Sequence, residues 1–177
     1  MITYTNIKYS DFFSFFNVRE TSKVKHGDNV TIKLKPGGFQ EFIDIEFIID
    51  SDEFLTESNL WLDRSWIGNE DRLNVFAKDI AKSYIRDMIV IDLQDQVATI
   101  VDILFQVKGE TDHIITISGD DPPSIQDVYV PELRSLVRTF AGLEPSWIFE
   151  TSEFIIQMDN TDNEGRERLR IRIQYKK

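Results

Sequence analysis

The chain has no cysteine, only two histidines and few glycines, eight in 177 residues. Without cysteine it can form no disulfide bond, thiolate nucleophile or cysteine-ligated zinc site. The histidines, His26 and His113, lie in no catalytic motif, and the glycines form no phosphate-binding loop or dinucleotide fingerprint. A serine-histidine-acid arrangement stays open, because its members can be distant in sequence. We therefore predict no catalytic residue and no cofactor, and we favour a protein that is not an enzyme.

One segment partly matches a calcium-binding loop. Asn160 and Asp162 could begin such a loop, but its twelfth position is Ile171, where a bidentate glutamate is needed. The flanking residues alternate as in strands. This segment therefore predicts a hairpin turn, and we expect no metal site.

Long apolar runs are also missing. No segment approaches the roughly 18 consecutive apolar residues of a membrane-spanning helix. Residues 1–9 lack the basic and apolar regions of a secretory signal. The chain is 41% hydrophobic, with thirteen phenylalanines and three tryptophans, which is ample for one packed core. We expect a single domain over residues 1–177, cytoplasmic and without a membrane partner.

Positive charge is scarce except at the end of the chain. The net charge is −11, yet six of the last twelve residues are basic and one is acidic, so residues 1–165 carry −16. Nucleic acid is excluded as a general partner because its phosphates would be repelled. A basic protein is the natural electrostatic complement.

The basic residues near the end of the chain follow a strand period. Arginines occupy every second position, and apolar residues fill most of the places between them: Arg166, Arg168, Arg170 and Arg172 alternate with Leu169, Ile171, Ile173 and Tyr175. Strand side chains alternate sides, so one face is cationic. The arginines could clamp an anion bidentately. We favour instead ion pairs with Glu153 and Asp159 of a neighbouring strand, on a charged strand that protects a sheet edge.

Acidic residues are densest in the first half of the chain. Residues 36–63 contain eight acids and no lysine or arginine. Within them Asp44, Glu46 and Asp50 alternate with apolar residues, which predicts one carboxylate-bearing strand face. Trp61 and Trp66 follow closely and could anchor a partner there. These five residues form the predicted partner-binding surface.

The apolar periods predict an α+β fold. We expect a short helix after Ser10 and Asp11, a loop at 20–29, a hairpin of 30–35 with 39–50, and a strand at 60–67. A long helix should begin after an Asn69 N-cap and run to about residue 88, and a second helix should start at residue 130 or 131 and end at 141. Strands are expected at 97–107 and 113–118, and a hairpin from 153–159 with 166–176. The fold class is thus a largely antiparallel sheet of about seven strands with two main helices and a short N-terminal helix.

Two functional hypotheses follow. The order of the expected elements resembles, in element order only, that of the small acidic dimeric chaperones of secretion systems, which work by binding. The leading hypothesis is a non-enzymatic acidic protein-binding module, of chaperone, immunity or inhibitor type, that engages a basic partner. The alternative is a small-ligand-binding protein or divergent enzyme that combines an aromatic pocket with the arginine-bearing strand. The residues that could line this pocket are Phe12, Phe13, Phe15, Phe16, Trp61, Trp66 and Trp147. A homodimer formed by sheet-edge pairing is a further possibility.

Overall fold

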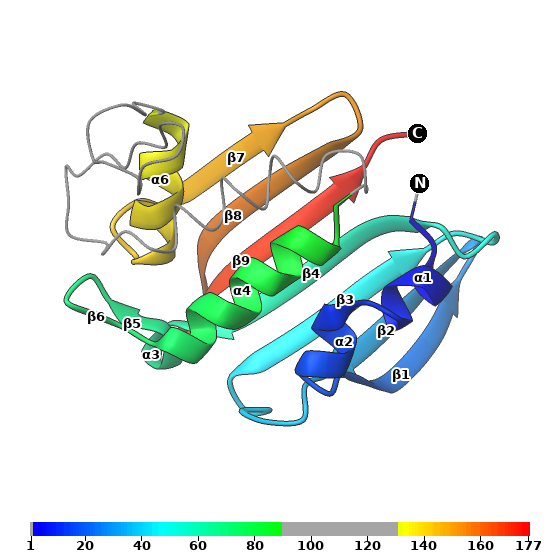
Figure 1. Ribbon diagram of the computed structural model, residues 1–177, viewed down its shortest axis with the longest axis horizontal. Helices are drawn as coiled ribbons and strands as arrows, with labels where there is room; N and C mark the ends of the chain where they lie inside the picture. The colour runs from blue at the N-terminus through cyan, green and yellow to red at the C-terminus, as the bar shows by residue number, and fades with distance from the viewer. Residues whose placement is uncertain (1, 90–130) are drawn as a thin grey trace, which may run out of the picture.

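A seven-stranded sheet dominates the computed structural model, which describes residues 2–89 and 131–177, and the side chains of these residues except 131–134 (Figure 1). Every neighbouring pair of strands is antiparallel, and the spatial order is β1-β2-β3-β4-β9-β8-β7. The strands are β1 Arg19–His26, β2 Asn29–Lys35, β3 Ile43–Ile49, β4 Leu55–Asp63, β7 Ser146–Glu150, β8 Phe154–Asn163 and β9 Arg166–Tyr175. The predicted class, α+β with a largely antiparallel sheet, is confirmed.

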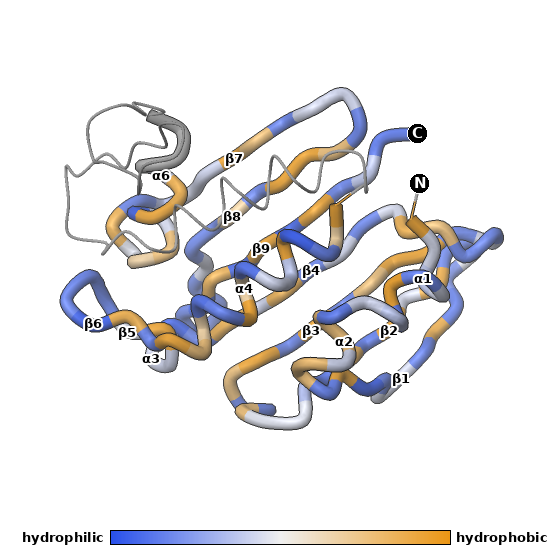
Figure 2. The backbone as a smooth tube through the Cα atoms, in the orientation of Figure 1, coloured by the Kyte–Doolittle hydropathy of each residue, from blue (hydrophilic) through white to orange (hydrophobic). Residues whose placement is uncertain are grey.

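The sheet is two-faced because apolar and polar residues alternate along its strands (Figure 2). On the apolar face, the exposed fraction is at most 1% for Ile45 and Phe47 of β3 and for Ile171 of β9. Their neighbours along each strand are partly exposed. Side chains of alternate residues leave a strand on opposite sides. One face therefore carries the core, and the other carries the charged residues.

Helices cover the apolar face. They are α1 Tyr4–Lys8, α2 Asp11–Phe15, α4 Val75–Asp87 and α6 Pro131–Phe140. In Figure 1, α4 runs along β4 and β9, α1 and α2 lie over β2 and β3, and α6 lies beside the β7 and β8 end of the sheet. The ring of Tyr84 on α4 meets that of Phe12 on α2 at 5.5 Å, and both are fully buried. Within the described residues, no helix is long and apolar enough to cross a membrane.

A short connection between β4 and α4 differs from the prediction. The strand expected at 60–67 is β4, but it begins at Leu55, ends at Asp63 and gives way to α3 Arg64–Ile67. A small hairpin of β5 Gly68–Asn69 and β6 Arg72–Leu73 follows. The predicted Asn69 N-cap is wrong.

The true N-cap of α4 is Asn74. Its Oδ1 accepts a hydrogen bond from the Phe76 amide at 2.9 Å. The Oδ1 of Asn69 instead accepts from the amides of Asp71 and Arg72, at 3.1 and 3.3 Å, and closes the β5–β6 turn. Asparagine suits both roles equally, since its side chain mimics a backbone acceptor, so the sequence could not choose between the two sites.

Other local predictions had mixed outcomes. The loop expected at 20–29 is wrong, because most of it is β1, an edge strand whose exposed residues show no apolar alternation. The helix after Ser10, the hairpin of β2 with β3 and the hairpin of β8 with β9 are confirmed. α1 and β7 were not predicted. The strands predicted at 97–107 and 113–118 lie outside the described residues.

Replacing Asn74 by alanine should destabilise the protein by about 1 kcal/mol, the usual loss for an N-cap side chain. Urea unfolding followed by far-ultraviolet circular dichroism measures this change. Asn69→Ala serves as the matched control, and it should leave the protection of α4 amides from hydrogen exchange unchanged. Loss of α4 protection in Asn69→Ala alone would contradict the assignment.

Candidate functional site

The open face of the sheet carries a ladder of ion pairs. Each arginine of β9 that the sequence singled out contacts a carboxylate on another strand: Arg166 with Asp63 at 3.0 Å, Arg168 with Asp44 at 3.0 Å, Arg170 with Asp159 at 3.0 Å and Arg172 with Glu57 at 2.7 Å. We call these eight residues the charge ladder. Their side chains are 16% to 47% exposed, so the pairs are partly screened from water. The arginines are committed to carboxylates of this chain, which does not favour an anion clamp.

The carboxylates predicted to bind a partner are engaged within the chain. Asp44 accepts from Lys35 at 2.7 Å as well as from Arg168 at 3.0 Å, with Arg166 at 3.9 Å. Glu46 lies opposite Lys33 in the register of β2 and β3. Asp44 is therefore compensated by close cations, and Glu46 has the positive charge of Lys33 beside it on the neighbouring strand.

Asp50 and Trp61 also have structural roles. Asp50 Oδ1 accepts from the amides of Asp52 and Phe54, both at 3.0 Å, and closes the turn after β3. Trp61 lies between Asp44 and Arg170 in the strand register, and the Arg168 guanidinium lies 5.6 Å from the centre of its ring. Asp44, Glu46 and Trp61 therefore share the open face with the arginines, while Asp50 stands apart at a turn.

Two glutamates of the open face titrate in opposite directions. Burial raises the pKa of Glu57, but hydrogen bonds from Arg172 and Asn59 outweigh it, so the pKa is lowered from its usual 4.5. Burial raises the pKa of Glu46 above 4.5, opposed by Lys33 and reinforced by Glu57. A lowered folded-state pKa means that the unfolded chain binds more protons. Glu57 thus contributes stability above pH 4.5 that is lost as pH falls through its folded pKa, whereas Glu46 has the reverse effect.

Glu57→Gln should reduce the free energy of unfolding at pH 7 and flatten its decline below pH 4.5. Glu46→Gln is the matched control on the neighbouring strand. It should keep the loss of unfolding free energy below pH 4.5 that depends on Glu57, and it should remove the opposite pH dependence that Glu46 contributes. Urea unfolding at pH 7, 5 and 3 measures both slopes. If wild type and Glu57→Gln lost equal stability between pH 5 and 3, the ladder would not hold this carboxylate ionised.

An aromatic groove lies on the other side of the sheet, at the end nearest α2 and the start of α4. Its volume is about 290 Å³, and no charged residue lines it. Its aromatic walls are Phe15, Phe16, Phe39, Trp66 and Phe76, which we call the aromatic groove residues. Three of them are markedly exposed: Phe15 at 78%, Phe76 at 58% and Phe39 at 45%. Water-exposed aromatic rings from separate segments thus gather around one depression.

Local backbone contacts hold the groove together. The Gly37 amide donates to the Phe16 carbonyl at 2.9 Å, which ties the β2–β3 loop to the end of α2. A Cβ on Gly37 would lie 2.9 Å from the Asn17 side chain, so this approach favours glycine. Phe39 follows with φ of 56°, and its ring lies 5.2 Å from that of Trp66 and 5.4 Å from that of Phe76. The turn residues therefore position Phe39 between α3 and α4.

The aromatic residues that the sequence grouped as a pocket are divided by the fold. Phe15, Phe16 and Trp66 line the groove, whereas Phe12 and Phe13 are buried core residues, as is Trp147 at 7% exposure. Phe39 and Phe76 were not proposed as groove residues. Phe76 fits the apolar period of α4 but lies in its first turn, beyond the edge of the core. The arginines of β9 project from the opposite sheet face, so groove and arginines do not form one site.

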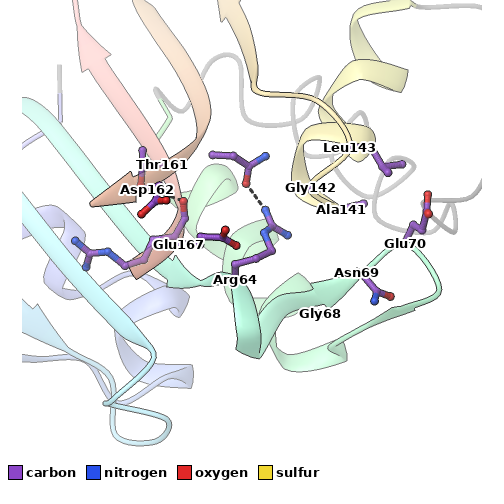
Figure 3. A pocket seen from close by; sticks show the side chains of 12 residues that line it. Arg64, Gly68, Asn69, Glu70, Ala141, Gly142, Leu143, Thr161, Asp162 and Glu167 are labelled. Carbon is purple, nitrogen blue, oxygen red and sulfur yellow. Dashed lines mark hydrogen bonds between the residues drawn. The ribbon is translucent and has the colours of Figure 1, made fainter. Parts of the chain in front are cut away.

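A third depression surrounds Arg64, between α3, the β5–β6 hairpin, the segment that follows α6, and the adjoining ends of β8 and β9 (Figure 3). Its volume is about 430 Å³. Arg64 donates to the Phe140 carbonyl at 2.7 Å and to Asn160 Oδ1. Asn160 in turn donates to the carbonyls of Thr139 and Glu144, both at 2.8 Å. Arg64 and Asn160 therefore fasten the C-terminal end of α6 to the sheet.

The charge of Arg64 has a structural explanation. Burial lowers its pKa, and nearby Glu167 opposes that shift. The Phe140 carbonyl belongs to the C-terminal end of α6, where a cation is favourable.

The segment that partly matches a calcium-binding loop forms a hairpin turn, as predicted. The Asp162 carboxylate accepts from the Gly165 amide at 2.9 Å and closes the β8–β9 turn. Within the described residues, no group of three acids or histidines could hold a metal ion.

Asn160→Ala should destabilise the protein by about 1–3 kcal/mol, because one Arg64 donor and the partly buried Glu144 carbonyl lose their side-chain partner. Urea unfolding measures the loss, and hydrogen exchange should show it concentrated in α6. Asn163→Ala, in the same strand near its exposed turn, is the control and should change stability by less than about 0.5 kcal/mol. Equal losses in the two variants would contradict this role for Asn160.

Comparison with known proteins gives no relative for this chain. No family model matches it, and no curated protein or solved structure is similar to it.

Proposed function

We propose that this protein is a non-enzymatic protein-binding module, of the chaperone, immunity or inhibitor type, that engages a basic partner through the aromatic groove. The single observation that carries this proposal is the exposure of Phe15, Phe39 and Phe76 around an uncharged depression. Large exposed apolar side chains that cluster mark interaction sites more often than isolated ones do. Aromatic residues also supply most anchors at protein interfaces.

The groove replaces the carboxylates of β3 as the contact surface of the proposal. Asp44 is held by two close cations, so a partner would have to break existing ion pairs to use it. Trp66, which the sequence offered as an anchor, lines the groove and stacks on Phe42 with the rings 5.9 Å apart. Its partner-binding role is kept in the proposal.

Net charge acts in this proposal at long range. The chain carries −11 overall, and residues 90–130 contribute eight acids and one lysine to it. A field of one sign accelerates encounter with an oppositely charged partner and is screened by salt. Association should therefore be faster at low ionic strength, while the groove determines how long the complex lasts.

A second candidate function uses the same groove. Its volume of about 290 Å³ and its uncharged lining are close to the lower limit of small-molecule sites. A small apolar ligand, without any part for the arginines of β9, is the version of the alternative hypothesis that the geometry favours.

The double variant Phe15→Ser with Phe76→Ser should lose at least tenfold in capture of a partner protein from a lysate of the source cells. Both side chains are largely exposed, so the fold should be little affected, and thermal unfolding checks this. Ile148→Ser is a matched control, since Ile148 on β7 is 58% exposed, like Phe76, and lies outside the groove. Proteins bound by wild type and control are identified by mass spectrometry.

Equal capture by the groove variant and the wild type would overturn the proposed binding surface. A bound apolar small molecule, released from wild type but not from the groove variant and seen by mass spectrometry, would favour the second candidate function instead.

A further inference from the structure

The aromatic groove adjoins a second depression between α2 and α4. That depression is lined by Phe15 and Phe16, which it shares with the groove, and by six polar or charged residues: Asp11, Ser14, Asp79, Lys82, Ser83 and Arg86. We call the two adjoining depressions together the channel; its lining is apolar near Phe76 and polar toward Arg86. From Phe76 to Arg86 the helix advances about 15 Å, at 1.5 Å per residue.

The cations of the polar half already have partners. Arg86 Nε donates to Asp87 at 3.1 Å and its Nη2 to Ser83 at 3.4 Å. Asp87 also accepts from the Phe12 amide at 2.8 Å, in the first turn of α2. Lys82 has an interaction of its own as well. Both basic side chains therefore already make contacts within the chain, which does not favour an anionic ligand here.

The carboxylates of the polar half differ in this respect. Asp11 and Asp79 are exposed, and neither has an ion-pair partner in the described part of the chain. They stand on the two walls of the channel, one on α2 and the other on α4. The charge ladder, by contrast, pairs each of its carboxylates with an arginine.

Each carboxylate lies about one helical turn from an exposed phenylalanine of the groove. Asp79 follows Phe76 by three residues on α4, and Asp11 precedes Phe15 by four on α2. These separations correspond to roughly 4.5 and 6 Å along the helix axes. An extended peptide advances about 3.3 Å per residue, so one or two residues span the same distance.

We propose that the channel binds a linear segment of a partner protein that carries a bulky apolar side chain and, one or two positions away, a lysine or arginine. The apolar side chain fills the aromatic groove, and the cation lies between Asp11 and Asp79. This inference rests on the proposed function and deepens it, because it replaces a general attraction to basic proteins by a defined pair of contacts.

Binding of a synthetic probe tests the inference directly. The probe is the nonapeptide Gly-Ser-Gly-Phe-Ser-Arg-Gly-Ser-Gly, compared with one peptide in which Glu replaces Arg and another in which Ser replaces Phe. The three tryptophans give three indole N–H signals in a ¹⁵N-labelled sample, and Trp66→Phe identifies the one that lines the groove. Titration of that signal gives the affinity of each peptide.

The Phe-Arg peptide should bind at least fivefold more tightly than the Phe-Glu peptide, and the peptide without Phe should not shift the Trp66 signal. The variant Asp11→Asn with Asp79→Asn should reduce the Arg preference to less than twofold. Partly exposed charge contacts of this kind are each worth a few-fold in affinity. The matched control, Asp28→Asn with Asp52→Asn, removes two exposed carboxylates elsewhere and should keep the preference.

The outcomes separate this inference from the proposed function. Equal affinity for the Arg and Glu peptides, or an unchanged preference in the Asp11 and Asp79 variant, would overturn the inference while partner capture by the groove stands. Equal partner capture by the wild type and by the Phe15→Ser with Phe76→Ser variant would overturn both. If light scattering shows a dimer of the 20.7 kDa chain that becomes monomeric in that variant, a second copy occupies the channel and the inference is wrong.

Discussion

The pairing of β4 with β9 is the contact on which the rest of the structure depends. It joins the four strands of the N-terminal half to the three strands near the C-terminus in one sheet. The seam is apolar on one face, where Leu60 and Ile171 are opposite each other and fully buried. On the other face the charge ladder crosses this seam. Arg172 of β9 contacts Glu57 of β4, and Arg168 of β9 contacts Asp44 of β3, on the far side of β4. Burial on one side and ion pairing on the other therefore act on the same seam.

The ladder explains how an acidic protein can carry four arginines in a row. A strand face with four like charges would be destabilised by repulsion. Here the carboxylates of β3, β4 and β8 compensate them one by one. Exposed ion pairs contribute little individually, but these are partly buried and arranged as a network. The ladder therefore serves mainly to fix which strands adjoin, and it leaves the open face close to neutral.

Binding is then assigned to the face that carries the helices. The residues beneath α4 and α2 are buried, and among them Tyr84 donates to Ser58 at 2.8 Å. Beyond the edge of that core, the first turn of α4, the end of α2 and the β2–β3 loop present aromatic rings that nothing in the described chain covers fully. Aromatic residues thus have two roles in this protein. Those packed against the sheet form the core, and those beyond its edge line the proposed binding groove.

The sequence by itself determined the local elements and their two-faced character. Alternation of apolar residues predicted the hairpins of β2 with β3 and of β8 with β9, and it placed the arginines of β9 on one side. The sequence also predicted Asp159 as an arginine partner within that hairpin, which the Arg170–Asp159 pair confirms. The sequence could not determine the long-range partners, since Arg168 and Asp44 are 124 residues apart and meet only after β9 enters the sheet beside β4. The same holds for the groove, where Phe15, Phe39 and Phe76 come from separate elements. Local periodicity records which way a side chain points, whereas the neighbour it meets depends on strand order and helix packing, which only the tertiary structure decided.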